Sequence, residues 1–255
     1  MSHSKSWILK NKGIETFGKI SSRVIAVMIS KNLFYCWFGN GEYSTLQKEC
    51  MASWKKYLPE YNVYRLDESN CDVNDPAVYR FYKRKQWAFV SDYFRLKALY
   101  EHGGIYLDVD VEVVRDLAPL LKNKAFVGYE DEGRLNTAVI GAEKGNEYVE
   151  ACLKIMRKRA ASKKQVLIAP EVATLAHREI EEKYGAKQNI VLTLPRVFFY
   201  PYNPYSKDPK FRVLMASRIT SNTYTIHHWE KSWEFSFYQK LSRKITNLLC
   251  DPPRK

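Results

Sequence analysis

The chain has 255 residues, of which 45% are hydrophobic, so it can bury one sizeable core, and its composition marks no boundary between two domains. No apolar run approaches the roughly 18 residues needed to cross a bilayer, so no membrane-spanning helix is predicted. The formal net charge of +13 predicts attraction to an anionic partner, and nucleic acid, acidic lipid head groups and a diphosphate substrate are the candidates.

Five cysteines lie far apart in the sequence and form no C-x-x-C pair. This spacing argues against a disulfide framework and against a cysteine-rich zinc site. We therefore expect reduced thiols and a cytoplasmic protein.

Residues 1–27 are polar, basic and weakly periodic, and we expect them to form a loosely attached N-terminal extension. The apolar run from Leu33 to Phe38 ends at Gly39-Asn40-Gly41, which predicts a buried first strand and a tight turn. A helix is predicted over Thr45–Tyr57 and a second strand over Tyr61–Leu66. The chain thus begins with a β-α-β unit.

From Arg84 to Tyr100 apolar residues recur every three or four positions, which predicts a helix against the core. Asp92 and Arg95 are three positions apart and share a face of this helix. Gly103-Gly104 then ends it, because glycine accepts backbone conformations that other residues resist.

From Ile105 to Val113 apolar residues alternate with polar ones, which predicts a strand with Asp108, Asp110 and Glu112 on one side. Two carboxylates about 7 Å apart repel by roughly 2 kcal/mol at an effective dielectric near 20. A divalent cation would turn that repulsion into binding, and Mn²⁺ or Mg²⁺ suits oxygen ligands. Ligands also bind at strand ends in α/β proteins. The alternative is a solvated acidic strand face.

These residues resemble the D-x-D nucleotide-sugar glycosyltransferases of glycosyltransferase family thirty-two, which includes bacterial capsular polysaccharide transferases and initiating mannosyltransferases. The clostridial glucosylating toxins are similar at a greater distance. The spacing that carries the resemblance is that of Ser91-Asp92, Arg95, Tyr106, Asp108 and Asp110. The resemblance implies a GT-A type α/β fold over a catalytic domain at residues 28–234, with a nucleoside diphosphate sugar as donor and Mn²⁺ or Mg²⁺ as cofactor.

The resemblance also implies residue roles. The expected catalytic residues are Asp108, Asp110 and Arg95, with the two aspartates as metal ligands and Arg95 directed at the diphosphate oxygens. The expected donor-binding residues are Trp37, Ser91, Asp92, Arg95, Tyr106, Asp108, Asn136 and Trp233. Trp37 is expected to stack on the base, and Trp233 to donate its indole N–H to a diphosphate oxygen. The resemblance implies that Asp92 and Tyr106 orient sugar or ribose hydroxyls and that Ser91 contacts the base or ribose.

Further along, strands are predicted at Ala125–Glu130 and Asn136–Glu143, and helices at Tyr148–Ala160 and Glu171–Tyr184. This alternation predicts a mixed, mainly parallel sheet covered by helices. Asn136 begins its strand, from which its amide could reach a sugar hydroxyl, although asparagine at a turn more often caps the backbone.

Residues 223–233 read TYTIHHWEKSW, in which two adjacent histidines end a predicted strand. Such a pair alone is more often structural than metal-binding. By spacing back from Trp233, the resemblance places a metal ligand at His228 and a second contact at Lys231 or Ser232. Within the C-terminal segment 235–255, residues 235–249 predict a basic amphipathic helix. Such a helix lies on an anionic membrane surface or packs on the core.

The resulting hypothesis is transfer of a hexosyl group, with retention, from a nucleoside diphosphate sugar to a growing capsule or lipopolysaccharide type glycan. The acceptor is expected to be a glycan or lipid-linked glycan, reached by a cytoplasmic protein peripheral on the inner membrane face. Nucleic acid is the less favoured partner. The alternatives are a basic nucleic-acid- or membrane-binding protein without catalysis, and a metal-dependent phosphohydrolase.

Overall fold

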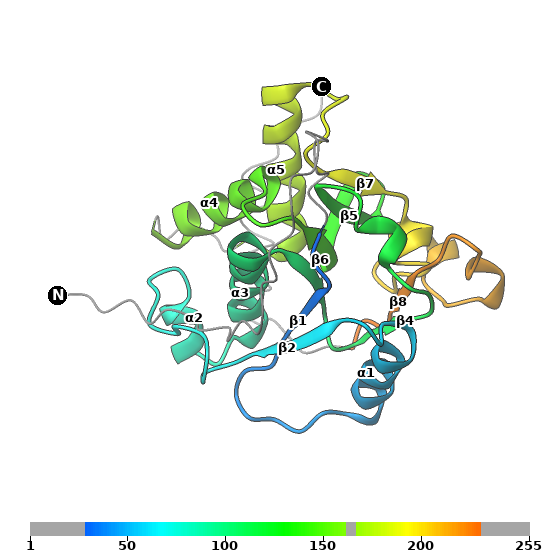
Figure 1. The fold of residues 1–255 in the computed structure, drawn as a ribbon, viewed down its shortest axis with the longest axis horizontal. Helices are drawn as coiled ribbons and strands as arrows, with labels where there is room; N and C mark the ends of the chain where they lie inside the picture. Colours follow the sequence, from blue (N-terminus) through cyan, green and yellow to red (C-terminus); the bar gives the residue numbers. More distant parts are fainter. Residues whose placement is uncertain (1–28, 162–166, 231–255) are drawn as a thin grey trace, which may run out of the picture.

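The structure is a computed structural model that describes residues 29–161 and 167–230, shown in Figure 1. Its strands are β1 (Asn32–Cys36), β2 (Asn62–Leu66), β3 (Gly104–Leu107), β4 (Val111–Val113), β5 (Ala125–Asp131), β6 (Arg134–Ala142), β7 (Leu192–Leu194) and β8 (Thr225–His227). Its α-helices are α1 (Thr45–Tyr57), α2 (Tyr79–Lys83), α3 (Trp87–His102), α4 (Glu147–Ala161) and α5 (Ala169–Tyr184). Four short 3-10 turns are η1 (Ala118–Leu120), η2 (Arg196–Phe198), η3 (Pro209–Phe211) and η4 (Ala216–Arg218).

A six-stranded sheet in the order β2-β1-β3-β6-β5-β7 forms the centre, and β4 pairs with β8 in a second, two-stranded sheet. In the large sheet β6 runs antiparallel to β3 and β5, while the remaining neighbours are parallel. The α/β class and the mixed, mainly parallel sheet predicted from the sequence are confirmed.

Alternation along the strands sends successive side chains into two cores on opposite faces of the large sheet. Phe34 and Tyr106 pack in the core that α3, α4 and α5 cover. Their neighbours Leu33 and Ile105 pack in the other core, with residues of α1 and β4. Both cores therefore fix the end of β3, which leads into the D-x-D motif.

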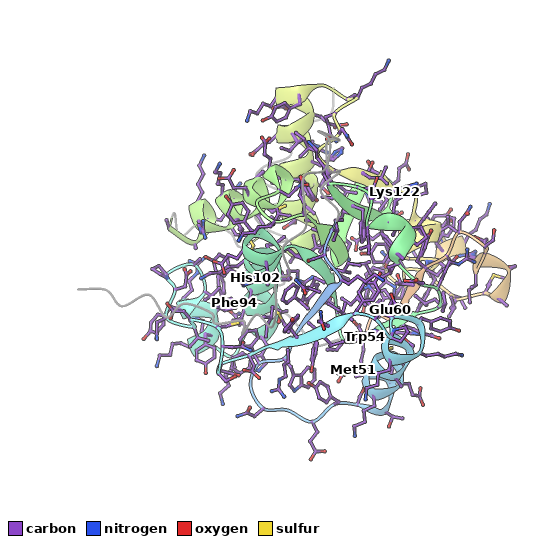
Figure 2. The ribbon with its side chains drawn as sticks, in the orientation of Figure 1. Met51, Trp54, Glu60, Phe94, His102 and Lys122 are labelled. Atoms are coloured by element: carbon purple, nitrogen blue, oxygen red, sulfur yellow. The ribbon has the colours of Figure 1, made fainter. Side chains whose placement is uncertain are left out.

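Helix α1 holds β4 in place. It begins with a capping box, in which Ser44 and Gln47 satisfy each other's backbone N–H groups. From its buried face Trp54, labelled in Figure 2, donates its indole N–H to the carbonyl of Val111 at 2.7 Å. The segment that follows the D-x-D motif is thus tied to a rigid helix.

The predicted glycine stop is confirmed, because α3 ends at His102 and β3 begins at Gly104. Gly103 and Gly104 have φ of +67° and +136°, and a Cβ on Gly104 would lie 2.5 Å from the carbonyl oxygen of Asn32. The predicted start at Arg84 is too early, since Lys85 has φ of +54° and interrupts the helix before Trp87.

Cys36, Cys50, Cys71 and Cys152 are buried and free. None of the helices at residues 29–161 and 167–230 is long and apolar enough to cross a membrane. The predictions for the extension 1–27 and for the segment 235–255 concern residues outside those that the structure describes.

Candidate active site

The two aspartates of the D-x-D motif lie in a turn between two sheets. β3 ends at Leu107, and the backbone N–H of Val111 donates to the carbonyl of Asp108 at 3.0 Å. The predicted continuous strand over Ile105–Val113 is therefore wrong, because β4 leaves the large sheet to pair with β8. As a result, Glu112 does not lie beside the two aspartates.

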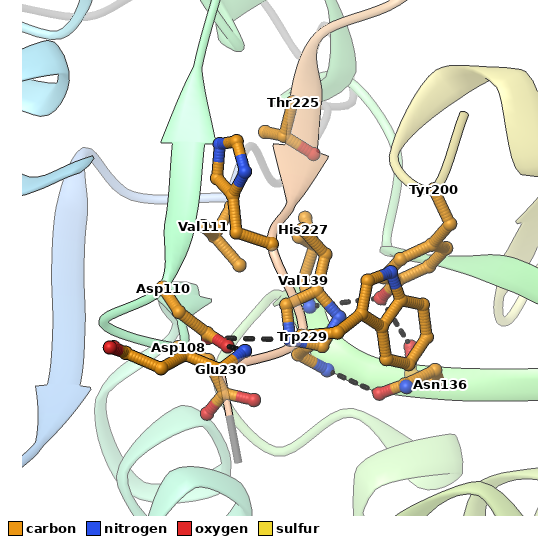
Figure 3. A network of polar contacts seen from close by, with 12 residues as sticks. Asp108, Asp110, Val111, Asn136, Val139, Tyr200, Thr225, His227, Trp229 and Glu230 are labelled. Carbon is orange, nitrogen blue, oxygen red and sulfur yellow. Dashed lines mark hydrogen bonds and ion pairs between the residues drawn. The ribbon is translucent and has the colours of Figure 1, made fainter. Parts of the chain in front are cut away.

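Asp108, Asp110 and His227 form a group suited to a metal ion. Each offers one ligand atom, and these atoms all lie within 4.8 Å of one another. The Nε2 atom of His227 lies 3.3 Å from Oδ1 of Asp110, and the backbone N–H of Glu230 donates to Oδ2 of Asp110 at 2.8 Å. Figure 3 shows these side chains converging from the D-x-D turn and from β8.

The electrostatics of this group follow from burial and from mutual charge. Burial alone would raise the pKa of Asp110, but the charge and hydrogen bond of His227 outweigh it and lower that pKa. Burial raises the pKa of Asp108, against the opposing effect of Arg95. For His227 burial favours the neutral ring, yet Asp110 raises its pKa. A bound cation would take over from His227 the offsetting of the negative charges on Asp108 and Asp110.

The predicted metal ligand His228 lies elsewhere. Its Nε2 atom is 2.9 Å from Oε2 of Glu112, so the two side chains form a pair of their own. The histidine facing the acids is His227, which pairs with Val111 in the β4–β8 register. The prediction was wrong by one residue. Because successive residues of a strand point to opposite sides, His228 lies on the side away from Asp110.

The guanidinium of Arg95 is almost fully buried and is occupied by protein groups. It contacts Asp92 at 2.9 Å and Asp108 at 3.0 Å, and it donates to the carbonyl of Thr137 at 3.0 Å. Its Nε donates to the carbonyl of Ser91 at 3.5 Å. Arg95 also lines the cavity, and its contact with a diphosphate stays a prediction. The protein contacts present here hold it against Asp108.

Tyr106 and Asp92 also have protein partners. The hydroxyl of Tyr106 donates to Oδ1 of Asp108 at 2.7 Å, and its ring lies 4.5 Å from the guanidinium of Arg95. Burial raises the pKa of Asp92 to about 6, although Arg95 opposes the shift. In this structure their polar atoms contact Arg95 and Asp108. Both side chains line the cavity, and orientation of donor hydroxyls by them stays a prediction.

Asn136 is turned toward a residue that sequence reasoning missed. Its amide N–H donates to Oε2 of Glu130 at 2.5 Å, and its amide oxygen accepts the backbone N–H of Ala138 at 2.8 Å. The other oxygen of Glu130 lies 2.6 Å from Nε of Arg134. Burial raises the pKa of Glu130, with Arg134 opposing the shift. Asn136 and Arg134 thus fix a buried carboxylate.

Trp37 lies at the end of β1, where it was predicted. Its indole N–H donates to the carbonyl of Gly41 at 2.8 Å, and its ring centroid is 4.3 Å from that of Tyr43. Base stacking by Trp37 stays a prediction, as does a base or ribose contact by Ser91. The proposed phosphate donor Trp233, with Lys231 and Ser232, lies outside the described residues.

Trp229 is a second residue that sequence reasoning did not assign. Its ring centroid lies 4.2 Å from that of His227, and its indole N–H donates to the carbonyl of Tyr202 at 2.9 Å. Its φ of +58° turns the chain after β8 so that Glu230 reaches Asp110. The sequence signal was the TYTIHHWE pattern itself, which gave no turn geometry.

A cavity of about 1660 Å³ lies over these groups. Its polar and aromatic lining includes Trp37, Ser91, Asp92, Asp108, Asp110, Glu130, Arg134, Asn136, His227 and Trp229. The cavity brings together every predicted donor-binding position among the described residues, and it excludes His228 and Glu112. Its size is sufficient for a ligand larger than a drug-like molecule.

Residues 44–127, about a third of the chain, match a family described as a glycosyltransferase sugar-binding region containing a DXD motif. The lactosylceramide 4-alpha-galactosyltransferase of Homo sapiens is 26% identical over 167 residues, which cover 61% of this chain and 45% of that protein. An uncharacterized protein of Arabidopsis thaliana is 41% identical over 66 residues, or 25% of this chain and 10% of that protein. The chain spans less than half the length of these relatives.

Among solved structures, the PaToxG glycosyltransferase has a TM-score of 0.51 at 20% sequence identity, over 62% of this chain and 70% of that chain. The fold is accordingly the predicted GT-A fold of glycosyltransferases. The residues that match the sugar-binding region run from α1 into β5 and contain Asp108 and Asp110.

Proposed function

We propose that the chain transfers a hexosyl group from a nucleoside diphosphate sugar to a hydroxyl group of a glycan, with the help of a divalent cation. The observation that supports this most directly is the meeting of Asp108, Asp110 and His227 within the cavity of a GT-A fold. The match of residues 44–127 to a sugar-binding region supports a sugar substrate.

The donor set fits Mn²⁺ or Mg²⁺, and the imidazole favours Mn²⁺. Two carboxylates and one imidazole supply oxygen and nitrogen ligands, and Nδ1 of His227 is buried with no hydrogen-bond partner among the described residues. When bound, such a cation would neutralise charge on the departing diphosphate as a Lewis acid. Asp108, Asp110 and His227 would hold it.

Other side chains of the cavity would hold Asp108 and the sugar donor in place. Arg95 favours the ionised form of Asp108 and orients it, and the hydroxyl of Tyr106 donates to one of its oxygens. Trp37, which lines the cavity, would stack on the base. These contacts support a donor bound across the end of β1 and the D-x-D turn.

The finer assignments are proposals of the same kind. The name of the lactosylceramide 4-alpha-galactosyltransferases makes a nucleoside diphosphate galactose and a glycolipid acceptor the first substrates to test. A lipid-linked capsule or lipopolysaccharide type glycan, a cytoplasmic location at the inner membrane face, and retention of configuration stay predictions. An inverted product observed by NMR would refute retention.

We expect Mn²⁺-dependent release of nucleoside diphosphate when the protein is screened against UDP- and GDP-hexoses. His227→Ala should weaken Mn²⁺ binding at least about tenfold, because losing even an outer-shell partner of a metal ligand costs that much. His228→Ala is the matched control, and its Mn²⁺ affinity should stay unchanged, since that ring contacts Glu112. Isothermal titration with Mn²⁺ measures both variants.

Three results would contradict the proposal. Release of inorganic phosphate from nucleotides without sugar transfer would indicate a phosphohydrolase. Salt-sensitive DNA binding that is indifferent to Asp110→Ala, without turnover of any nucleotide sugar, would indicate a basic binding protein. Equal Mn²⁺ affinities of the His227→Ala and His228→Ala variants would show that His227 is not a metal ligand.

We propose that Glu130 contacts a substrate hydroxyl, because its carboxylate lies in the cavity wall and is held there by Asn136. Glu130→Gln keeps the size of the side chain and removes the charge. Losing a hydrogen bond to a charged group costs about 1.5–3 kcal/mol, so kcat/KM for transfer should fall roughly 10- to 150-fold. Steady-state transfer measures this, and an unchanged kcat/KM would contradict the role.

A matched control separates this role from damage to the metal site. Mn²⁺ affinity of Glu130→Gln should remain that of the wild type, because Glu130 is not one of the three grouped ligands. Glu132→Gln, an exposed neighbour on the same cavity rim, should leave both quantities unchanged.

A further inference from the structure

Residues 206–220 form an excursion between the wall of the cavity and β8, which we call the basic-apolar loop. In Figure 1 it is the orange ribbon that projects at the right edge. A hydrogen bond orders the chain near each end of the loop: the backbone N–H of Asn203 donates to the carbonyl of Phe211 at 2.7 Å, and that of Thr220 donates to Oγ1 of Thr223 at 3.0 Å. The loop is therefore an ordered projection.

The outer part of the loop exposes large apolar side chains. Val213 is 67% exposed, Met215 51% and Ile219 40%. Single exposed apolar residues are ordinary on a protein surface, but here three lie within seven positions of one projecting loop, and a cluster of exposed apolar side chains often marks an interaction surface. Val213 and Met215 lie between the 3-10 turns η3 and η4 of this projecting loop.

Cations flank the apolar tip. Lys207, Lys210, Arg212 and Arg218 lie on the loop with a single acid, Asp208. The carboxylate of that acid accepts the backbone N–H of Lys210 at 2.9 Å, so it caps a 3-10 turn. An apolar tip within a cationic border complements an anionic head-group layer, where aliphatic stems bury and charged ends stay wet.

We propose that the basic-apolar loop docks on an anionic lipid membrane surface. Lys207 and Asp208 also line the cavity, and the loop leads within a few residues into β8, which carries His227. Docking through the loop would hold this side of the cavity at the membrane. The proposal does not depend on the proposed function, because vesicle binding needs no turnover, and it concerns residues other than 235–249.

The experiment is vesicle co-sedimentation of the full chain with phosphatidylglycerol-containing and purely phosphatidylcholine vesicles. Val213→Ser/Met215→Ser should weaken partitioning into the anionic vesicles roughly tenfold, because two apolar side chains that would be partly buried in the bilayer are lost. Lys210→Gln should weaken it roughly fivefold. Binding should be released near 1 M salt, where charge interactions are screened within about 3 Å.

The control is Val63→Ser/Leu192→Ser, which removes two exposed apolar side chains, 49% and 40% exposed, from strands outside the loop. Its partitioning should equal that of the wild type.

Donor hydrolysis in solution should be unchanged in Val213→Ser/Met215→Ser, which separates membrane docking from the proposed sugar transfer. Unchanged partitioning of the loop variants would overturn the proposal, and so would equal binding to phosphatidylcholine. Loss of self-association in the double variant without a vesicle effect would indicate a second copy as the partner, and would also overturn it.

Discussion

Asp110→Asn is expected to lower Mn²⁺-dependent turnover of the sugar donor by at least about a thousandfold. A bound cation contributes several kcal/mol of charge stabilisation on the departing diphosphate, and each 1.36 kcal/mol corresponds to about a factor of ten. Asparagine preserves the size of Asp110 and can still accept the backbone N–H of Glu230, but it removes the negative charge that faces His227. The measurement is the initial rate at saturating donor across a Mn²⁺ titration.

Glu112→Gln is the matched control for this variant. It removes a carboxylate two positions away, from a half-exposed side chain whose partner is His228. Since exposed ion pairs contribute about 0–1 kcal/mol, the rate should change by less than about fivefold. If Asp110→Asn kept the wild-type rate at all Mn²⁺ concentrations while remaining folded, the metal site would be in the wrong place.

The sequence predicted those parts of the site that depend on local patterns. Asp92 and Arg95 share a helical face three positions apart, and the structure joins them at 2.9 Å. The Gly103-Gly104 pair ended the helix as expected, because both residues have positive φ. Helix α1 runs over Thr45–Tyr57, as predicted. Local chemistry sufficed in each case.

The partner of the D-x-D acids required long-range information. Whether His227 or His228 faces Asp110 depends on the register of β8 against β4, which pairs Val111 with His227 across more than a hundred residues. A register error of one residue exchanges the two faces of a strand. The period of two along Ile105–Val113 likewise carried no sign that the chain would change sheets after Asp108.

Glu130 escaped prediction for a related reason. In the sequence it opens an acidic run with Asp131 and Glu132, which resembles a solvated loop. In the structure β5 extends to Asp131, with register irregularities against β6, and Glu130 meets Asn136 and Arg134 across the hairpin. Its burial is a property of the paired strands and has no signature in either one alone.

Arg95→Ala is expected to destabilise the folded protein by about 3–5 kcal/mol, because it leaves the buried carboxylate of Asp92 and the partly buried carboxylate of Asp108 without their guanidinium partner. Burial already raises the pKa of Asp92 to about 6, and Arg95 opposes that shift. Without Arg95 the pKa values of Asp92 and Asp108 in the folded protein rise further above their values in the unfolded chain. Stability that depends on a raised folded-state pKa is present at low pH and lost as pH rises through that pKa. The deficit should therefore be larger at pH 8 than at pH 5, as measured by urea unfolding.

Arg115→Ala is the control, because its guanidinium is exposed and lies 5.8 Å from the centre of the ring of Tyr224. Its cost should be about 0.5–1 kcal/mol and independent of pH over this range. A deficit for Arg95→Ala that was equal at pH 5 and pH 8 would show that lost packing, and not uncompensated charge, explains the effect.

Arg95→Lys then separates two roles for this cation. If Arg95 orients Asp108, a single ammonium cannot reproduce contacts to Asp92, Asp108 and Thr137 at once, and Mn²⁺ affinity should fall before any donor is added. If Arg95 instead delivered charge to the diphosphate, Mn²⁺ affinity would stay at the wild-type value and only donor binding would weaken. The buried, fully engaged guanidinium favours the first outcome, which a Mn²⁺ titration monitored by electron paramagnetic resonance would measure directly.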